Sequence, residues 1–98
     1  MAILSSTELS QALQQLPDWR IEEGMLVREL VFPSFPDAIQ FVDQLATIAE
    51  QQQHHPDIDI RYTRVRLGLV SHDAGGLTRK DTEMASKIDA MLSSGRAR

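Results

Sequence analysis

Apolar and polar residues follow one another along this chain with two different periods, and each change of period predicts a new element of secondary structure. Spacings of three and four between apolar residues predict helices near residues 5–16, 34–52 and 78–92. Spacings of two predict one hairpin around Glu23-Gly24 and a second around Thr63-Arg64. The expected order is therefore helix, two strands, helix, two strands, helix.

Capping residues stand where each expected helix should begin. Ser5 is followed three residues later by Glu8, and Thr78 is followed three residues later by Asp81, so both pairs fit a capping box. Ser34 is placed to cap the central helix. After the last helix, residues 93–98 are expected to form a frayed tail.

The central helix carries the broadest apolar face. Its expected stripe, suited to lying on a sheet, consists of Phe35, Ala38, Ile39, Val42, Leu45, Ala46 and Ala49. Phe41 and Ile48 fall outside this stripe, so they either widen the core or face a partner subunit.

The strands differ in how clearly they indicate a buried face. The second strand has Leu26, Leu30 and Phe32 on one face and Met25, Val27 and Val31 on the other, so its facing stays open. The second hairpin is predicted to place on its two strands the apolar sets Ile58, Ile60, Tyr62 and Val65, Leu67, Leu69. Trp19, before the first hairpin, is either a core residue or an aromatic wall of a site.

These elements predict the fold class. Two hairpins, with no long parallel crossover inside either pair, point to an α+β fold in which a four-stranded, mostly antiparallel sheet carries three helices on one face. A length of 98 residues suits one compact core, so residues 1–98 are expected to form a single domain.

Composition and charge exclude several classes of function. The net charge is −4, and basic residues alternate with acidic ones, so the dominant positive field that nucleic-acid binding requires is missing. There is no cysteine, which removes disulfides, thiolate nucleophiles and Cys-ligated zinc. No secretion signal or membrane span is recognisable, so a cytoplasmic protein is expected.

All three histidines lie between Glu50 and Asp81. His54 and His55 follow the central helix, and Pro56 forces His55 toward extended geometry. The second hairpin should return the chain to its starting point and bring His72 to the same end of the sheet. Because imidazole titrates near neutral pH, three such groups suit a site that donates one proton and accepts another.

Other interpretations of these residues stay open. His54 and His55 could be solvated side chains at a helix end, where the helix dipole favours imidazolium. Three histidines with a carboxylate could hold zinc, but adjacent histidines on extended backbone point apart, so no metal is expected. Asp81 could serve as a helix cap, as part of the site, or as both.

The stretch resembles a known family. The residues that carry the resemblance are Glu50-x-x-x-His54-His55-Pro56-Asp57, then Tyr62, then Ser71-His72-Asp73-x-Gly75-Gly76-Leu77-Thr78-x-x-Asp81. Their types and spacing resemble the signature of the pterin-4a-carbinolamine dehydratases, and the resemblance extends over nearly the whole chain. Ile58 and Thr63 depart from the residues common at their positions in that family.

The resemblance implies an activity and a set of site residues. The activity is dehydration of 4a-hydroxytetrahydrobiopterin, or a related carbinolamine, to quinonoid dihydropterin, in the recycling of tetrahydropterin; the pterin is the substrate and no cofactor is implied. His54, His55 and His72 are implied as catalytic residues, with His54 and His72 as candidates for acid and base. The implied substrate-binding residues are Glu50, His54, His55, Pro56, Ser71, His72, Asp73, Ala74, Arg79 and Asp81.

The family also resembles proteins that act by association. Its fold serves as a dimerisation cofactor of a transcription factor and as an assembly factor of a carbon-fixing enzyme, so a protein-binding module is the alternative function. The intact set of three histidines favours catalysis over this alternative. A homodimer or homotetramer is expected in either case.

Overall fold

The structure is a computed structural model that describes residues 2–93. The helices are α1 (Ser6–Gln14), α2 (Phe35–Gln52) and α3 (Arg79–Ser93), and the strands are β1 (Arg20–Glu22), β2 (Met25–Val31), β3 (Asp57–Arg61) and β4 (Arg64–Leu69). The strands form one sheet in the order β1-β2-β4-β3, and all neighbours are antiparallel. The predicted order of elements and the α+β class are confirmed. Beyond Ser93, which ends α3, the predicted tail lies outside the described residues.

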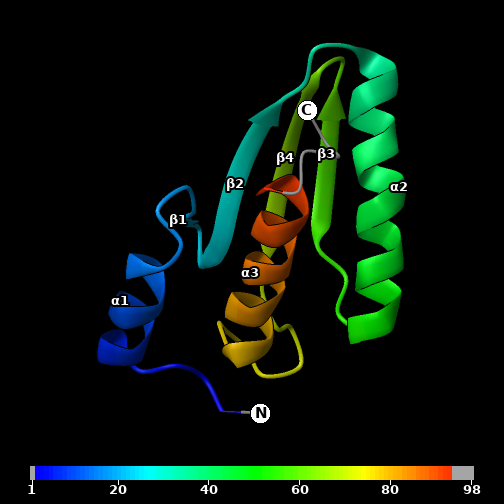
Figure 1. The fold of residues 1–98 in the computed structure, drawn as a ribbon. Coiled ribbons are helices and arrows are strands. Elements are labelled where there is room, and N and C mark those ends of the chain that lie inside the picture. The colour runs from blue at the N-terminus through cyan, green and yellow to red at the C-terminus, as the bar shows by residue number, and fades with distance from the viewer. Residues whose placement is uncertain (1, 94–98) are drawn as a thin grey trace.

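The helices lie on one side of the sheet (Figure 1). The α2 and α3 helices run along the strands, whereas α1 lies beyond the β1 edge. The α2 helix ends at the same end of the sheet at which β3 begins, β4 ends and α3 begins. Segments that are far apart in the sequence therefore meet at this end.

The predicted helix starts are confirmed by their caps. Ser5 and Glu8 exchange the two hydrogen bonds of a capping box, and the Ser34 hydroxyl accepts from the Asp37 amide. The first hairpin turns at Glu23 and Gly24, whose φ angles of 52° and 79° suit the right-handed twist of the strands. The turn of the second hairpin lies one residue earlier than predicted, because Arg64 already belongs to β4.

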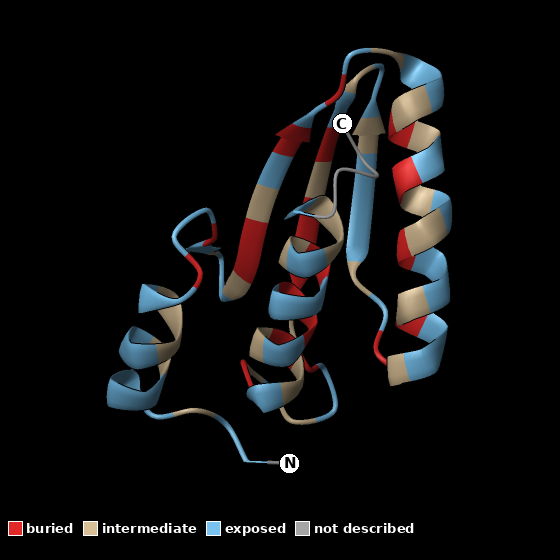
Figure 2. Ribbon diagram, in the orientation of Figure 1, coloured by how far each residue is buried: buried red, intermediate tan, exposed pale blue. Residues whose placement is uncertain are grey.

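The core fills the space between the sheet and the helices (Figure 2). On α2 the buried residues are Ala38, Phe41, Leu45 and Ala49, so the predicted stripe was wrong in part. Phe35 is 45% exposed and Ala46 is exposed, whereas Phe41 has no exposed surface and its ring centroid lies 5.2 Å from that of Phe32. The α2 helix is rotated about its axis relative to the predicted facing, so that Phe41 packs against Phe32, the residue that follows β2.

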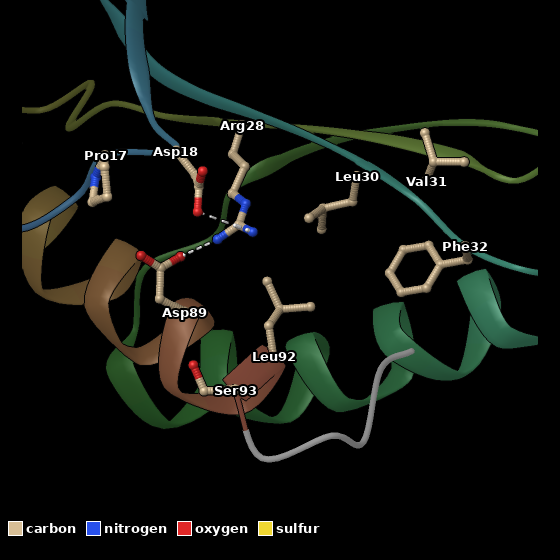
Figure 3. A pocket seen from close by; sticks show the side chains of 9 residues that line it. All are labelled: Pro17, Asp18, Arg28, Leu30, Val31, Phe32, Asp89, Leu92 and Ser93. Carbon is tan, nitrogen blue, oxygen red and sulfur yellow. Dashed lines mark hydrogen bonds and ion pairs between the residues drawn. The ribbon is translucent and has the colours of Figure 1, made fainter.

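The open question about β2 is resolved by which side chains join the core, because Val27, on the other face, is also buried but lies outside the core cluster. Leu26, Leu30 and Phe32 are buried on the core side, while Val31 is 68% exposed. Arg28 shares the core side and extends to α3, where its Nη1 lies 2.6 Å from Asp89 Oδ1 (Figure 3). Trp19 is 5% exposed and donates from its indole nitrogen to the same Asp89 oxygen, so it is a core residue.

The prediction for β3 was wrong at two positions. Tyr62 was expected to face the core, but it occupies the hairpin turn with a φ of 55° and is 75% exposed. Ile58 is also exposed, and only Ile60 packs against the core. An edge strand is covered by a neighbour on one side only, so alternation of apolar residues overestimates its burial. Within residues 2–93, no helix has the length and apolar character needed to cross a membrane.

The facing of α2 can be tested with two phenylalanines of the same helix. Phe41→Ala should lower the free energy of unfolding by roughly 3–5 kcal/mol, because it leaves a cavity in the core. Phe35→Ala should cost less than about 1 kcal/mol, because half of this side chain is exposed. Urea unfolding followed by circular dichroism measures both values, and a larger loss for Phe35→Ala would contradict the observed facing.

Candidate functional site

The end of α2 directs His54 and His55 to different environments. Gln53 adopts a left-handed conformation with φ 51° and ψ 43°, which turns the chain sharply after the helix. The His54 amide donates to the Ala49 carbonyl at 3.1 Å and closes the last turn. Beyond this turn His54 is buried and His55 is exposed. The two imidazoles therefore differ in their surroundings although they are adjacent in sequence.

His54 contacts the carboxylate of Asp81, which lies 27 residues later in the sequence. Its Nε2 lies 2.6 Å from Asp81 Oδ1, and the two side chains are 10% and 0% exposed. Asp81 belongs to the first turn of α3. A buried charge is tolerated only where it is hydrogen-bonded, so this contact is part of what allows Asp81 to be buried.

The second oxygen of Asp81 has two further partners. Oδ2 accepts from the Thr78 amide at 2.9 Å and from the Ser71 hydroxyl at 2.9 Å. The Ser71 and Thr78 hydroxyls are themselves 2.8 Å apart. Asp81 thus caps α3 with one oxygen and holds His54 with the other, so the predicted alternatives of cap and site residue are compatible.

A tight turn places Ser71 and His72. The Ser71 carbonyl accepts from the amides of Ala74, Gly75 and Gly76, and Gly75 takes a φ of 80° that strongly favours glycine. The Ser71 side chain points into the buried network, whereas His72, the next residue, is exposed. Gly75 and Gly76 therefore lie in a turn that is held by backbone hydrogen bonds.

Most of the other site residues expected from the sequence lie at the surface. His55 Nε2 is 2.6 Å from Glu50 Oε2, and both side chains are exposed. Arg79 pairs with Glu83 on its own helix, and Asp73 is exposed. Pro56 and Ala74 are half-buried. The structure thus brings His54 and Ser71 into contact with Asp81 and leaves His55 and His72 on the surface.

Two contributions were not predicted from the sequence. Thr78 was expected only to cap α3, but its hydroxyl also joins the buried network. A cavity of about 440 Å³ at His72 is lined by Gly75, Gly76 and Val70 and, from the first hairpin, by Glu23, Gly24 and Met25. The spacing of Thr78 and Asp81 was visible as a capping box, but nothing in the sequence links the first hairpin to His72.

Two further hollows of the described surface are lined by none of the expected site residues. A pocket of about 440 Å³ beside Arg28 and Asp89 is lined by polar and apolar side chains, among them Leu30 of β2 and Leu92 of α3 (Figure 3). A second hollow of about 380 Å³ lies on the open face of the sheet beside Glu29, Arg64 and Arg66.

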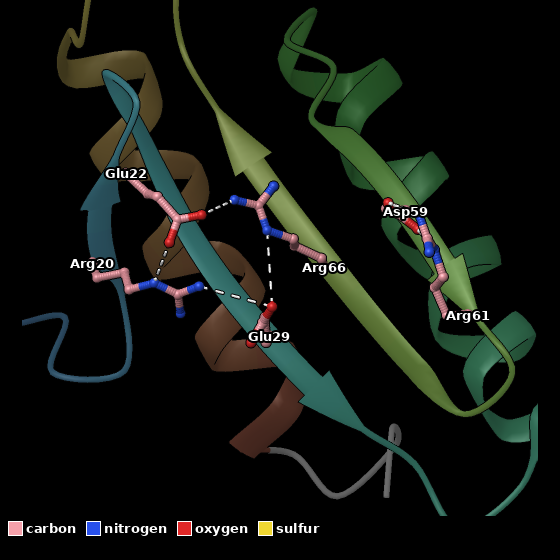
Figure 4. Close-up of polar contacts among 6 residues, drawn as sticks. All are labelled: Arg20, Glu22, Glu29, Asp59, Arg61 and Arg66. Carbon is pink, nitrogen blue, oxygen red and sulfur yellow. Dashed lines mark hydrogen bonds and ion pairs between the residues drawn. The ribbon is translucent and has the colours of Figure 1, made fainter.

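The open face of the sheet carries paired charges (Figure 4). Arg20 and Arg66 flank Glu22, and both also pair with Glu29. Hydrogen bonds from Arg20 and then from Arg66 lower the pKa of Glu22, so it is ionised at neutral pH. These four residues balance one another in charge and carry no reactive group. Within residues 2–93, no group of three His, Cys, Asp or Glu side chains is arranged to hold a metal ion.

Comparison with known proteins shows the family to which this chain belongs. A family profile described as "Pterin 4 alpha carbinolamine dehydratase" matches residues 2–91. The chain belongs to the pterin-4a-carbinolamine dehydratase family. A protein of Chloroflexus aurantiacus, provisionally named pterin-4-alpha-carbinolamine dehydratase, is 51% identical over 94% of this chain and 99% of its own length. A protein of Mycolicibacterium smegmatis with the same provisional name is 47% identical over 95% of this chain and 99% of its own length.

Two solved structures share the dehydratase-family fold. A transcriptional coactivator/pterin dehydratase from Brucella melitensis is 32% identical, with a TM-score of 0.86 over 98% of this chain and 99% of that chain. A pterin dehydratase-like protein described as a RuBisCO assembly factor in the alpha-carboxysome is 26% identical, with a TM-score of 0.60 over 74% of this chain and 83% of that chain. The same fold is thus found in proteins whose names describe different roles.

The contrast between the two histidine–carboxylate pairs gives a test. Asp81→Ala should lower the free energy of unfolding by roughly 3–5 kcal/mol, because buried His54, Ser71 and Thr78 would each lose a partner. Glu50→Ala should change it by less than about 1 kcal/mol, because the Glu50–His55 pair is exposed. Urea unfolding at neutral pH measures both, and equal effects would contradict the difference in burial.

Proposed function

We propose that this protein is a dehydratase that converts 4a-hydroxytetrahydrobiopterin, or a related pterin carbinolamine, to quinonoid dihydropterin. The observation that carries the proposal is the His54 imidazole, which lies 2.6 Å from the buried Asp81 carboxylate at a histidine of the family motif. A carboxylate behind a histidine fixes the orientation of the ring and stabilises its protonated form. Membership of the family supplies the substrate class.

The proposed reaction needs two proton transfers. The bond between C4a and its hydroxyl oxygen breaks as a proton is added to that oxygen, which leaves as water. A proton leaves a ring nitrogen, and the electron pair of that N–H bond forms the new double bond. No oxidant or cofactor enters this balance. His54 and His72 are the candidates for these transfers, each of which contributes roughly 100- to 10,000-fold in rate.

The remaining residues divide by exposure into two roles. His55, Pro56, Asp73, Ala74 and Arg79 have surface that can contact a pterin, and Glu50 holds the exposed ring of His55. Ser71 and Asp81 are 3% and 0% exposed. We therefore assign them the task of holding His54 rather than touching the substrate.

The alternative function is association with another protein. It is favoured by the solved relatives whose names describe a transcriptional coactivator and an enzyme assembly factor. That function would use the exposed faces of helices and would not need His54, His55 or His72. The presence of all three histidines, together with the buried Asp81 partner, favours the dehydratase. The proposed setting is the cytoplasm, as expected from the sequence.

The dehydratase proposal is tested with purified protein and 4a-hydroxytetrahydrobiopterin. His54→Gln and His72→Ala should each lower the rate of dehydration by roughly 100-fold or more, because each removes a proton-transfer group. Arg61→Ala is the matched control, since Arg61 is exposed on β3 and should leave the rate unchanged. Wild-type rates in both histidine variants would overturn the assignment of acid and base, and an inactive wild-type protein would favour the association role.

The proposed oligomer is tested separately. Size-exclusion chromatography with light scattering should give a mass two or four times the 11.0 kDa of one chain. A monomer at micromolar concentration would contradict the expected homodimer or homotetramer.

A further inference from the structure

The direction of the hydrogen bonds around Asp81 is set by backbone amides. The Lys80 amide donates to Thr78 Oγ1 at 3.2 Å, and the Thr78 amide donates to Asp81 Oδ2 at 2.9 Å. An amide N–H can only donate, so Thr78 Oγ1 and Asp81 Oδ2 must both be acceptors at these contacts. The backbone amides at the start of α3 therefore determine which of these side-chain oxygens accept hydrogen bonds, wherever the side-chain protons lie.

The two hydroxyls complete a chain with one consistent direction. If Thr78 donates its proton to Ser71 Oγ, at 2.8 Å, then Ser71 is free to donate to Asp81 Oδ2, at 2.9 Å. If Ser71 instead donated its proton to Thr78 Oγ1, the Thr78 proton would have no acceptor among the described residues. Asp81 would also lose one hydrogen-bond donor. Since both hydroxyls are buried, an unmade bond here costs about 1–3 kcal/mol, and the first order is favoured.

This direction of the hydrogen bonds determines whether Asp81 accepts a hydrogen bond from His54 or donates one to it. Oδ2 accepts two hydrogen bonds, an arrangement that suits an ionised carboxylate, which is an acceptor only. Oδ1 is then an acceptor as well, and the group facing it at 2.6 Å is His54 Nε2. His54 must therefore carry a proton on Nε2.

The other nitrogen of His54 is left free to act. Nδ1 has no hydrogen-bond partner among the described residues, and it is not among the side-chain atoms sealed from solvent without a partner. With Nε2 protonated, the lone pair of the neutral ring lies on Nδ1, which is not completely sealed from solvent. Only the Nδ1 edge of this largely buried ring is thus available for proton exchange.

We infer that Ser71 and Thr78 are positioning residues that act through Asp81 to hold His54 in the tautomer with its proton on Nε2, which makes Nδ1 the proton-exchanging atom. Nδ1 accepts a proton, the resulting imidazolium is stabilised by Asp81, and the proton is later returned from Nδ1. The tautomer follows from the contacts alone, whereas its catalytic use rests on the proposed function.

The tautomer is tested without any substrate by ¹⁵N NMR of the histidine rings. In the wild-type protein at alkaline pH, Nε2 of His54 should show the chemical shift of a protonated nitrogen and Nδ1 that of an unprotonated one. In Asp81→Asn the backbone amide of Thr78 requires the amide oxygen on its side, so the NH₂ group must face His54. The pattern should then reverse to a protonated Nδ1. A protonated Nδ1 in the wild-type protein, or no reversal in the variant, would overturn the inference.

The positioning role is tested by removing one hydroxyl. Thr78→Val should lower kcat for dehydration roughly 10- to 100-fold with KM within about twofold, because Thr78 supports a reactive group without touching the substrate. Thr78→Ser should restore both kcat and the ¹⁵N pattern. Thr82→Val is the matched control, since Thr82 lies in the first turn of α3, close to Thr78 in sequence, and its hydroxyl donates to the Arg79 carbonyl outside the network.

The outcomes separate the inference from the proposed function. A protein without dehydratase activity whose His54 shows the expected tautomer and reversal would overturn the function and support the network. An active protein with the opposite tautomer would overturn the network and support the function. If Thr78→Val does not fold, the wild-type and Asp81→Asn spectra still decide, and an unchanged kcat in a folded Thr78→Val would exclude the positioning role.

Discussion

The buried carboxylate of Asp81 is the constraint on which the site depends. A charge without solvent must be surrounded by donors, and here the donors come from three separate segments: the amide at the start of α3, the hydroxyl of Ser71 after β4, and the ring of His54 after α2. Removing any of them would leave the charge less compensated. The carboxylate therefore ties these segments to one another, and the geometry of His54 follows from that of the whole end of the sheet.

The α3 helix is held by carboxylates at two places along its length. Near its start Asp81 joins it to β4 and α2, and near its end Asp89 accepts from Arg28 of β2 and from Trp19. Between them the apolar residues Met84, Ala85 and Ile88 pack into the core. Apolar packing alone is weakly directional, whereas these hydrogen bonds fix the rotation and the translation of α3. The position of the first turn of α3, and so of Asp81, depends on both.

The site combines a buried, hydrogen-bonded part with exposed parts. His54 is buried and bonded, while His55 and His72 stand at the surface on either side of the same network. Such a division suits a reaction in which one group must keep its orientation while others meet the substrate. Among the relatives that share the fold, one is described as a transcriptional coactivator/pterin dehydratase and another as a RuBisCO assembly factor. The fold therefore does not decide the function, and the proposed dehydratase activity rests on the histidines and their buried partner.

The sequence by itself determined the elements, because their signals are local: the caps at Ser5, Ser34 and Thr78, the alternation in the strands, and the turn at Glu23-Gly24 lie within a few residues of what they specify. It also identified His54, His55 and His72 as candidate site residues, since residue type and spacing can be read directly from the chain. Only the tertiary structure decided that Phe41 rather than Phe35 enters the core, that Tyr62 faces solvent, and that Ser71 and Thr78 reach His54 through Asp81. Helix rotation, the exposure of an edge strand and a hydrogen bond between residues 27 positions apart depend on which elements pack together, and a local pattern does not contain that information.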